Sequence, residues 1–324
     1  MVTFTAGLTL ASAGTASVAT PAWRALQNHD PSRARLVTSD IPNFWRVFDR
    51  ASLTGAAESF QREYLDRGSP GLHDFLSARI QSSRLLAATV AMRPRYYAAI
   101  RNNTFALDTS AAFKDAIHAA FGRLKAFDDE AVFPDVYFVI GRMNSAGTTS
   151  SNGLLIGVEM NARDGETPVD ELTAWERAVT GLISDLPHIV AHELVHLQQP
   201  APGGTPTLLD QALREGAADF VAELISGGHN NRLQHVYGDA HERELWEEFT
   251  KSMNGTDVSH WLYQGDRATD RPADLGYYIG YKICEAYYRR EADKSRAVRQ
   301  ILHANGAEEF LRRSGYSGGT PRQK

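Results

Sequence analysis

The segment AHELVHLQQ, residues 191–199, places three ionisable side chains within two helical turns of a stretch that is otherwise apolar. A buried helix has no structural use for His192, Glu193 and His196, because a buried polar group without a partner costs free energy. Residues four apart lie on the same face of a helix, so the two imidazoles can reach one ion. The spacing therefore predicts a metal site.

Glu193 is rotated by about 100° from His192 around the helix axis, so it lies beside such an ion without binding it. This is the H-E-x-x-H pattern of zinc peptidases, in which the glutamate is the general base for a water molecule. We therefore predict Glu193 as the catalytic base and one zinc ion (Zn²⁺) per chain as the cofactor.

A catalytic zinc site needs a third protein ligand, and the helical stretch LLDQALREGAADFVAELISGG, residues 208–228, offers one. Glu215 stands there among small residues. A glycine inside a helix costs about 1 kcal/mol relative to alanine, so Gly216 indicates a close helix–helix contact. Asp219 follows one turn later and is placed to accept the second N–H of a ligating histidine. We expect Glu215 as the third ligand and Asp219 behind a histidine.

The composition limits both the partners and the chemistry. A net charge of −5 and the lack of a dense Lys/Arg run argue against a nucleic-acid partner. The single cysteine, Cys284, excludes a disulfide within the chain and any cysteine-rich zinc module. A bound zinc must therefore use histidine and carboxylate ligands.

The elements that must position these residues follow from the apolar pattern. Residues 24–130 are predicted to form an N-terminal helical region, and residues 131–324 the region that carries the chemistry. Residues 132–142 and 154–160 are strand candidates, joined by a turn-rich connection. We expect the motif helix to begin at Asp185 and to end before Pro200. Residues 24–324 are expected to form one compact domain.

Residues 1–23 resemble a leader or signal segment, with no charge before Arg24 and many small residues, but they lack a positive n-region. The segment is too weakly hydrophobic and too rich in Thr, Ser and Gly for a stable membrane span. The sequence leaves open whether the protein is cytoplasmic or is exported to the cell envelope.

The motif residues also carry a family resemblance. His192, Glu193 and His196, followed after eighteen residues by Glu215, resemble the gluzincin arrangement of zinc peptidases. The chain more closely resembles the bacterial family of predicted zinc-dependent proteases related to the gliding-motility lipoprotein B. The matching pieces are YFVIGRMNSAGT, HELVHLQQ, LREGAADFVAEL and LGYYIGYKI. The resemblance implies a mainly helical α+β, zincin-like fold, with a small β-sheet packed over the active-site helix, and a peptide or protein substrate.

In a zincin-like fold an edge strand over the active-site helix binds extended peptide by strand addition. We expect residues 154–160 to be that strand. Glu159 in this segment is interpreted either as a residue that binds the substrate's amine or as an ordinary exposed strand residue.

A tyrosine-rich segment, residues 273–290, follows the third ligand. Gly276 and Gly280 are four apart and offer one face for close contact with another backbone. In zinc aminopeptidases a tyrosine at a similar distance donates to the carbonyl oxygen of the substrate as negative charge builds there. Tyr277 and Tyr278 are both candidates for this role, and spacing does not choose between them.

The leading functional hypothesis is a zinc-dependent metallopeptidase. The alternative is a zinc-binding but catalytically silent accessory or structural protein of the cell envelope. A third option, a binding module without metal, is disfavoured by three ligands at this spacing. Glu193 favours the enzyme, because a purely structural metal site has no use for a base beside its ligands.

Overall fold

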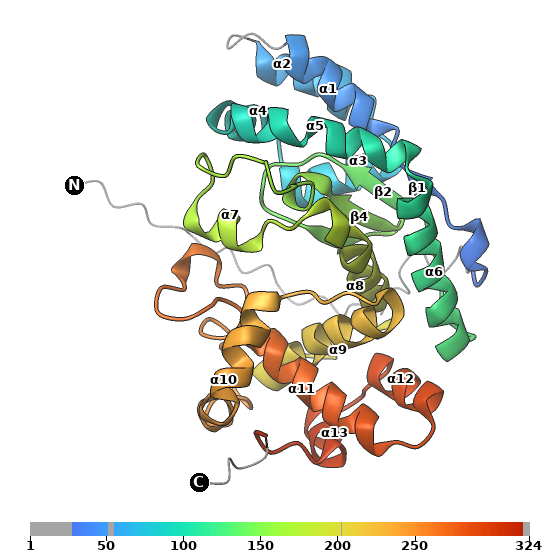
Figure 1. The fold of residues 1–324 in the computed structure, drawn as a ribbon, viewed down its shortest axis with the longest axis vertical. Helices are drawn as coiled ribbons and strands as arrows, with labels where there is room; N and C mark the ends of the chain where they lie inside the picture. The colour runs from blue at the N-terminus through green and yellow to red at the C-terminus, as the bar shows by residue number, and fades with distance from the viewer. Residues whose placement is uncertain (1–27, 51–54, 202, 320–324) are drawn as a thin grey trace.

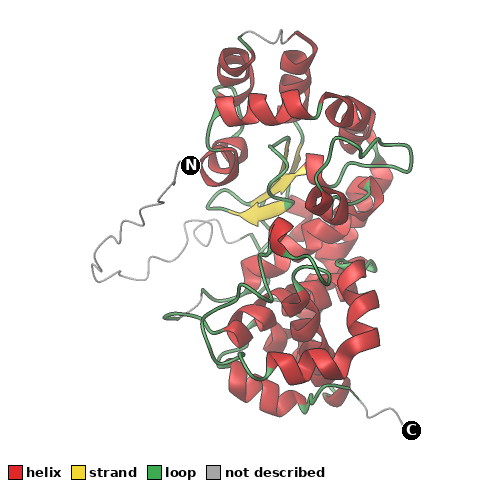
Figure 2. Cartoon of the chain, turned by 90° about the vertical axis from the view of Figure 1, so that its left-hand side faces the viewer, coloured by secondary structure: helices red, strands yellow, loops and turns green. Residues whose placement is uncertain are grey.

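The computed structural model describes residues 28–50, 55–201 and 203–319, and the leader expected over residues 1–23 lies outside them. The described chain is mainly helical and contains one small four-stranded sheet. Figure 2 shows this sheet between an upper and a lower group of helices. The mainly helical α+β class predicted from the sequence is therefore confirmed.

The N-terminal helices form the upper group (Figure 1). They pack around a cluster of buried aromatic side chains. Phe44, Trp45 and Tyr64 are fully buried, and the Phe44 ring meets the other two edge to face at 5.0 and 5.4 Å. Such aromatic pairs add to the apolar burial that holds the helices together. The helices of this group are α1 (Asp40–Arg50), α2 (Ala56–Phe60), α3 (Pro70–Phe75), α4 (Ser83–Met92) and α5 (Pro94–Thr109). The next helix, α6 (Ala111–Phe127), leads down to the lower group and packs against its helices.

The sheet has the strand order β1-β2-β4-β3. β1, β2 and β4 run parallel, whereas β3 pairs with β4 in the antiparallel direction and forms one edge. β2 and β4 are buried along their whole length, as expected for parallel strands covered on both faces. The strands are β1 (Leu36–Val37), β2 (Val136–Val139), β3 (Gly147–Thr149) and β4 (Leu154–Gly157).

The predicted edge strand over residues 154–160 is wrong in position. β4 ends at Gly157, continues as a 3₁₀ turn (Val158–Met160), and lies inside the sheet between β2 and β3. The edge strand is β3, within the segment predicted as a turn-rich connection. Its Gly-Thr-Thr sequence contains no bulky apolar residue, and its three residues are half-buried or exposed, so the alternation that marks a strand in a sequence is missing.

α8 (Leu186–Gln198), which carries the histidine motif, packs against β3 and β4. It begins after Asp185 with Pro187 in its first turn and ends before Pro200, as predicted, although the Asp185 side chain makes no capping hydrogen bond. Val190 and Leu194 are fully buried. The apolar positions of the helix therefore anchor it in the core, which fixes the direction of the polar ones.

α9 (Leu208–Ser226) carries the predicted third ligand and lies between α8 and α11 (Leu275–Arg290). It begins with a capping box formed by Thr207 and Asp210 and ends at Gly227 in the left-handed conformation. A Cβ added to Gly216 would lie 2.1 Å from the carbonyl carbon of Gly280. The close helix approach predicted from these two glycines is therefore confirmed.

The remaining helices complete the lower group and its border with the sheet (Figure 1). Within the part of the chain that the structure describes, every helix is too short or too polar to span a lipid bilayer. These remaining helices are α7 (Ala174–Val179), α10 (Arg232–Phe249), α12 (Lys294–Leu302) and α13 (Ala307–Ser314).

Candidate metal centre

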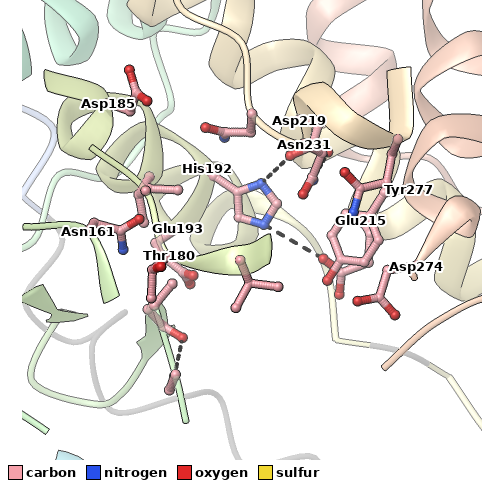
Figure 3. Close-up of a pocket in the computed structure, with 18 of the residues that line it drawn as sticks. Asn161, Thr180, Asp185, His192, Glu193, Glu215, Asp219, Asn231, Asp274 and Tyr277 are labelled. Carbon is pink, nitrogen blue, oxygen red and sulfur yellow. Dashed lines mark hydrogen bonds and ion pairs between the residues drawn. The ribbon is translucent and has the colours of Figure 1, made fainter. Parts of the chain in front are cut away.

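The three predicted metal ligands meet where α8 and α9 pack together. The Nε2 atom of His196 lies 2.9 Å from the Nε2 atom of His192 and 3.1 Å from Oε2 of Glu215. The His192 Nε2 atom lies 3.6 Å from the same carboxylate oxygen, and Figure 3 shows its ring directed toward Glu215. The three ligand atoms lie within 4.8 Å of one another. One ion can therefore contact all three.

Hydrogen bonds on the far side of each imidazole decide which ring nitrogen faces the centre. Nδ1 of His192 lies 2.8 Å from Oδ1 of Asp219, which was predicted to lie behind a histidine. Nδ1 of His196 lies 2.8 Å from Oε1 of Gln199. The Gln199 amide donates through Nε2 to the carbonyl of Arg214, so its oxygen is the atom left to accept. In their neutral forms both histidines therefore carry hydrogen on Nδ1 and a lone pair on Nε2.

This arrangement fits a divalent cation. Two nitrogen lone pairs and a carboxylate oxygen converge, and three acceptors so close together repel one another unless positive charge lies between them. Two imidazoles and a carboxylate form a ligand set that zinc prefers. The acceptors behind the rings also match the hydrogen bonds that metal-binding histidines usually donate.

The electrostatics of the centre also favour positive charge. Burial opposes the ionised form of Glu215, but the neighbouring His196 and His192 outweigh it and hold its pKa well below the ordinary value. Burial likewise opposes a charged His192, but hydrogen bonds to Asp219 and Glu215 raise its pKa well above the ordinary value. A proton and a metal ion therefore compete for the same place.

A loop residue that the sequence did not single out holds the third ligand. The Tyr263 hydroxyl donates to Oε1 of Glu215 at 2.8 Å, which leaves Oε2 facing the histidines. Tyr263 has a φ of 55°, which is rare for a bulky residue and requires support from its surroundings. Gln264 and Asp274 provide that support by exchanging two backbone-to-side-chain hydrogen bonds of 2.9 Å.

No motif marks Tyr263 in the sequence, because its role depends on how the loop before α11 folds over α9. Gln199, the acceptor behind His196, was also not singled out, although its position gives a weak signal of that role. It follows His196 by three residues, and residues three apart in a helical turn lie on neighbouring positions of one face.

The predicted catalytic base, Glu193, lies on α8 beneath the edge strand. A Cβ added to Gly147 of β3 would lie 2.5 Å from Oε1 of Glu193, so the strand backbone covers this carboxylate closely. Burial raises the pKa of Glu193 above the ordinary value, although His196 and His192 act in the opposite direction. A raised pKa brings the carboxyl closer to the range in which a general base works near neutral pH.

The two candidate tyrosines point in different directions. The Tyr277 ring lies nearly parallel to the His192 ring, with 6.4 Å between their centres, and lines the same cleft (Figure 3). Burial and the nearby Glu215 raise the pKa of Tyr277 well above the ordinary value, so its hydroxyl keeps its proton. Tyr278 is fully buried on another face of α11 and donates to Asp239 on α10 at 3.1 Å. The structure brings only Tyr277 to the cleft.

Glu159, the predicted amine-binding or exposed strand residue, fits neither interpretation. It lies in the 3₁₀ turn after β4 and is fully buried. Its carboxylate accepts hydrogen bonds from the backbone N–H groups of Gly141 (2.7 Å) and Met143 (3.1 Å). Burial raises its pKa to about 7. Glu159 therefore fixes the chain that follows β2 and does not face the cleft.

The cleft above the candidate centre has a volume of about 770 Å³. Its walls come from β3, the segment around residues 180–182, the facing sides of α8 and α9, and the start of α10. Figure 3 shows Glu193 and Thr180 on one side, and Tyr277 and Asp274 on the other. This is the size of a typical ligand pocket, and it opens directly above the three converging side chains.

Comparison with known proteins agrees with this geometry. Residues 172–311 match a family described as predicted Zn-dependent protease (DUF2268). The match spans α8, α9 and α11, and therefore includes the whole ligand cluster. No curated protein and no solved structure matches the chain. The finding supports a zinc protease family for this part of the chain.

Proposed function

We propose that the protein is a zinc-dependent metallopeptidase of the gluzincin type with a zincin-like fold. His192, His196 and Glu215 would hold the zinc ion, one per chain. The observation that carries the proposal is the convergence of three acceptor atoms beside a buried glutamate, at the base of an open cleft. A structural zinc site is usually closed by four protein ligands, whereas a catalytic site keeps a position free.

A zinc ion bound by such a set supplies Lewis acidity, which makes water a competent nucleophile near neutral pH. Glu193 would accept the proton of the attacking water and then pass it to the nitrogen of the leaving amine. Tyr277 would donate its hydroxyl proton in a hydrogen bond to the carbonyl oxygen as negative charge builds there. Asp219 would keep His192 in the required tautomer and orientation.

The edge strand supports a peptide as the substrate. β3 pairs with β4 on one side only, so the backbone groups along its other edge can pair with an extended chain. Glu193 lies directly beneath Gly147 of this strand. A peptide paired with β3 would therefore pass close to the base and to the metal ligands.

The proposal is tested with purified protein and a proteome-derived peptide mixture, with cleavage sites mapped by mass spectrometry. We expect about one zinc per chain, loss of cleavage after the metal is removed with 1,10-phenanthroline, and recovery when zinc is restored. A protein that holds zinc and leaves every peptide intact would instead support the accessory-protein alternative. A protein that binds no zinc would contradict both.

A further inference from the structure

The wall of the cleft contains buried polar atoms that have no partner. Among the described residues, six buried side-chain nitrogen or oxygen atoms lack a hydrogen bond, and four belong to residues that line this one cleft. A buried polar group without a partner loses its hydration and gains no hydrogen bond in return, so such groups are few and call for an explanation. The four atoms are Nε of Arg79, Oδ1 of Asn144, Nδ2 of Asn161 and Nε of Arg163.

Two of these groups lie on one short segment just after β4. Asn161 is only 2% exposed, and it lies on the same side of the cleft as Glu193, opposite Tyr277 and Asp274 (Figure 3). Arg163 follows two residues later. Its backbone N–H donates to Gly181, and its carbonyl accepts from Ile183. The two side chains therefore extend from backbone that is fixed to the neighbouring chain.

The chemistry of this segment selects an anion. Both unpaired atoms, Nδ2 of Asn161 and Nε of Arg163, are hydrogen-bond donors. No carboxylate in the described residues forms an ion pair with Arg163, although Asp185 lines the same cleft. A guanidinium with free donors matches a carboxylate in charge and in geometry better than it matches a neutral carbonyl.

Arg79 does not belong to this pair. Its Nη2 atom donates to the hydroxyl of Thr148 on β3 at 3.1 Å, and its carbonyl accepts from Arg142 and Asn144. It is therefore tied to the edge strand, whereas Asn161 and Arg163 lie beyond the end of β4.

We propose that Asn161 and Arg163 form a subsite that binds a carboxylate of the peptide substrate. The peptide part of this inference rests on the proposed function. The carboxylate is supplied either by an acidic side chain near the cleaved bond or by the C-terminus of the substrate. Both sources present the same two oxygens to the amide and guanidinium donors.

The test measures binding, so that it does not depend on cleavage. Zinc-loaded protein carrying Glu193→Gln is immobilised and exposed to decapeptide libraries in which one position is fixed as Glu or Gln, the others being random but free of Asp and Glu. Each library is made with an amidated and with a free C-terminus, and retained peptides are counted by mass spectrometry. We expect Glu to be retained about 10-fold over Gln at one position, or the free acid over the amide.

Variants then assign the preference to the subsite. Arg163→Gln should reduce the ratio to about 1, Asn161→Ala should lower it, and Arg163→Lys should keep part of it. Arg232→Gln is the matched control, because it removes the same charge from another element that lines the cleft, the start of α10. It should leave the ratio unchanged.

Equal retention of Glu and Gln peptides, and of acid and amide, would overturn the subsite. An equal fall of the retention ratio in the Arg163→Gln and Arg232→Gln proteins would also overturn it, because the preference would then depend only on the net charge of the cleft. If Arg163→Gln fails to fold, as judged by circular dichroism, Asn161→Ala and Arg163→Lys still decide the matter. A protein that prefers the carboxylate but cleaves nothing would contradict the proposed peptidase alone.

Discussion

Which atom of each side chain faces the centre decides what the candidate site can do. The two histidines offer Nε2 only because Asp219 and Gln199 hold their Nδ1 atoms. Glu215 offers one oxygen because Tyr263 engages the other. Residue types at a given spacing are therefore necessary for this chemistry, and the hydrogen bonds behind them complete it.

At this scale the third ligand gives the first prediction. Glu215→Ala removes one of three ligand atoms and should weaken zinc binding at least about 100-fold, measured by competition with a chromogenic chelator. Glu223→Ala on the same helix is the control, because Glu223 pairs with His229 and Tyr281 and lies outside the ligand cluster. Unchanged zinc affinity in Glu215→Ala would require another third ligand.

The neighbouring tyrosines give a second prediction. Tyr277→Phe removes a donor that faces the cleft, so turnover of a cleaved peptide should fall about 100-fold while the zinc content stays the same. Tyr278→Phe removes a hydroxyl bound to Asp239 and should cost about 1 kcal/mol of stability without changing turnover. The reverse result would assign the role to Tyr278.

At the scale of whole elements, the close packing of α9 against α11 brings Glu215 on α9 near Tyr277 on α11. Gly216→Ala would place a methyl group against the backbone of Gly280 and should destabilise the protein by about 3 kcal/mol in urea unfolding. Gly122→Ala in the exposed face of α6 meets no atom within 4 Å and should stabilise by about 0.5 to 1 kcal/mol. Similar effects of both changes would mean that helix propensity alone governs Gly216.

The stability of the folded protein should depend on pH through Glu159, whose carboxyl group holds the chain between β2 and β3. Burial raises the pKa of this carboxyl from 4.5 to about 7 in the folded protein, so the folded state holds the proton more tightly than the unfolded state. Its contribution to stability is therefore fully present below pH about 4.5 and is lost as the pH rises through about 7.

Denaturant unfolding of wild type and of Glu159→Gln at several pH values measures this effect. The stability of wild type relative to the variant should fall by about 3 kcal/mol between pH 4.5 and 7.5. A difference that stays constant with pH would mean that Glu159 titrates normally in the folded protein.

How well the sequence predicted each element depended on the source of its stability. α8 and α9 carry apolar periodicity and clear end signals, such as Pro187 and Thr207, and their positions were predicted. The edge strand β3 has no such signal, because it exists only through pairing with β4. Because β3 gives no signal, the sequence predicts the edge strand at residues 154–160 and places Glu159 on it, whereas the edge is formed by β3.

At the scale of the whole molecule, the cleft joins parts of the chain that are distant in sequence. Gly147, Glu193 and Glu215 come from β3, α8 and α9, and Tyr263 comes from a loop before α11. Sequence spacing predicted the residues that share one helix or follow helical periodicity. It could not predict Tyr263 or the unpaired donors of Asn161 and Arg163, since these depend on tertiary packing alone.

The most direct test of the account compares zinc-loaded wild type with Glu193→Gln in peptide turnover, with the zinc content of both proteins measured. Glutamine keeps the shape of the side chain and leaves the metal ligands unchanged, but it cannot accept the proton of the attacking water. We predict near-normal zinc content and a loss of about 100-fold or more in turnover. A Glu193→Gln protein as active as wild type would contradict the proposed mechanism.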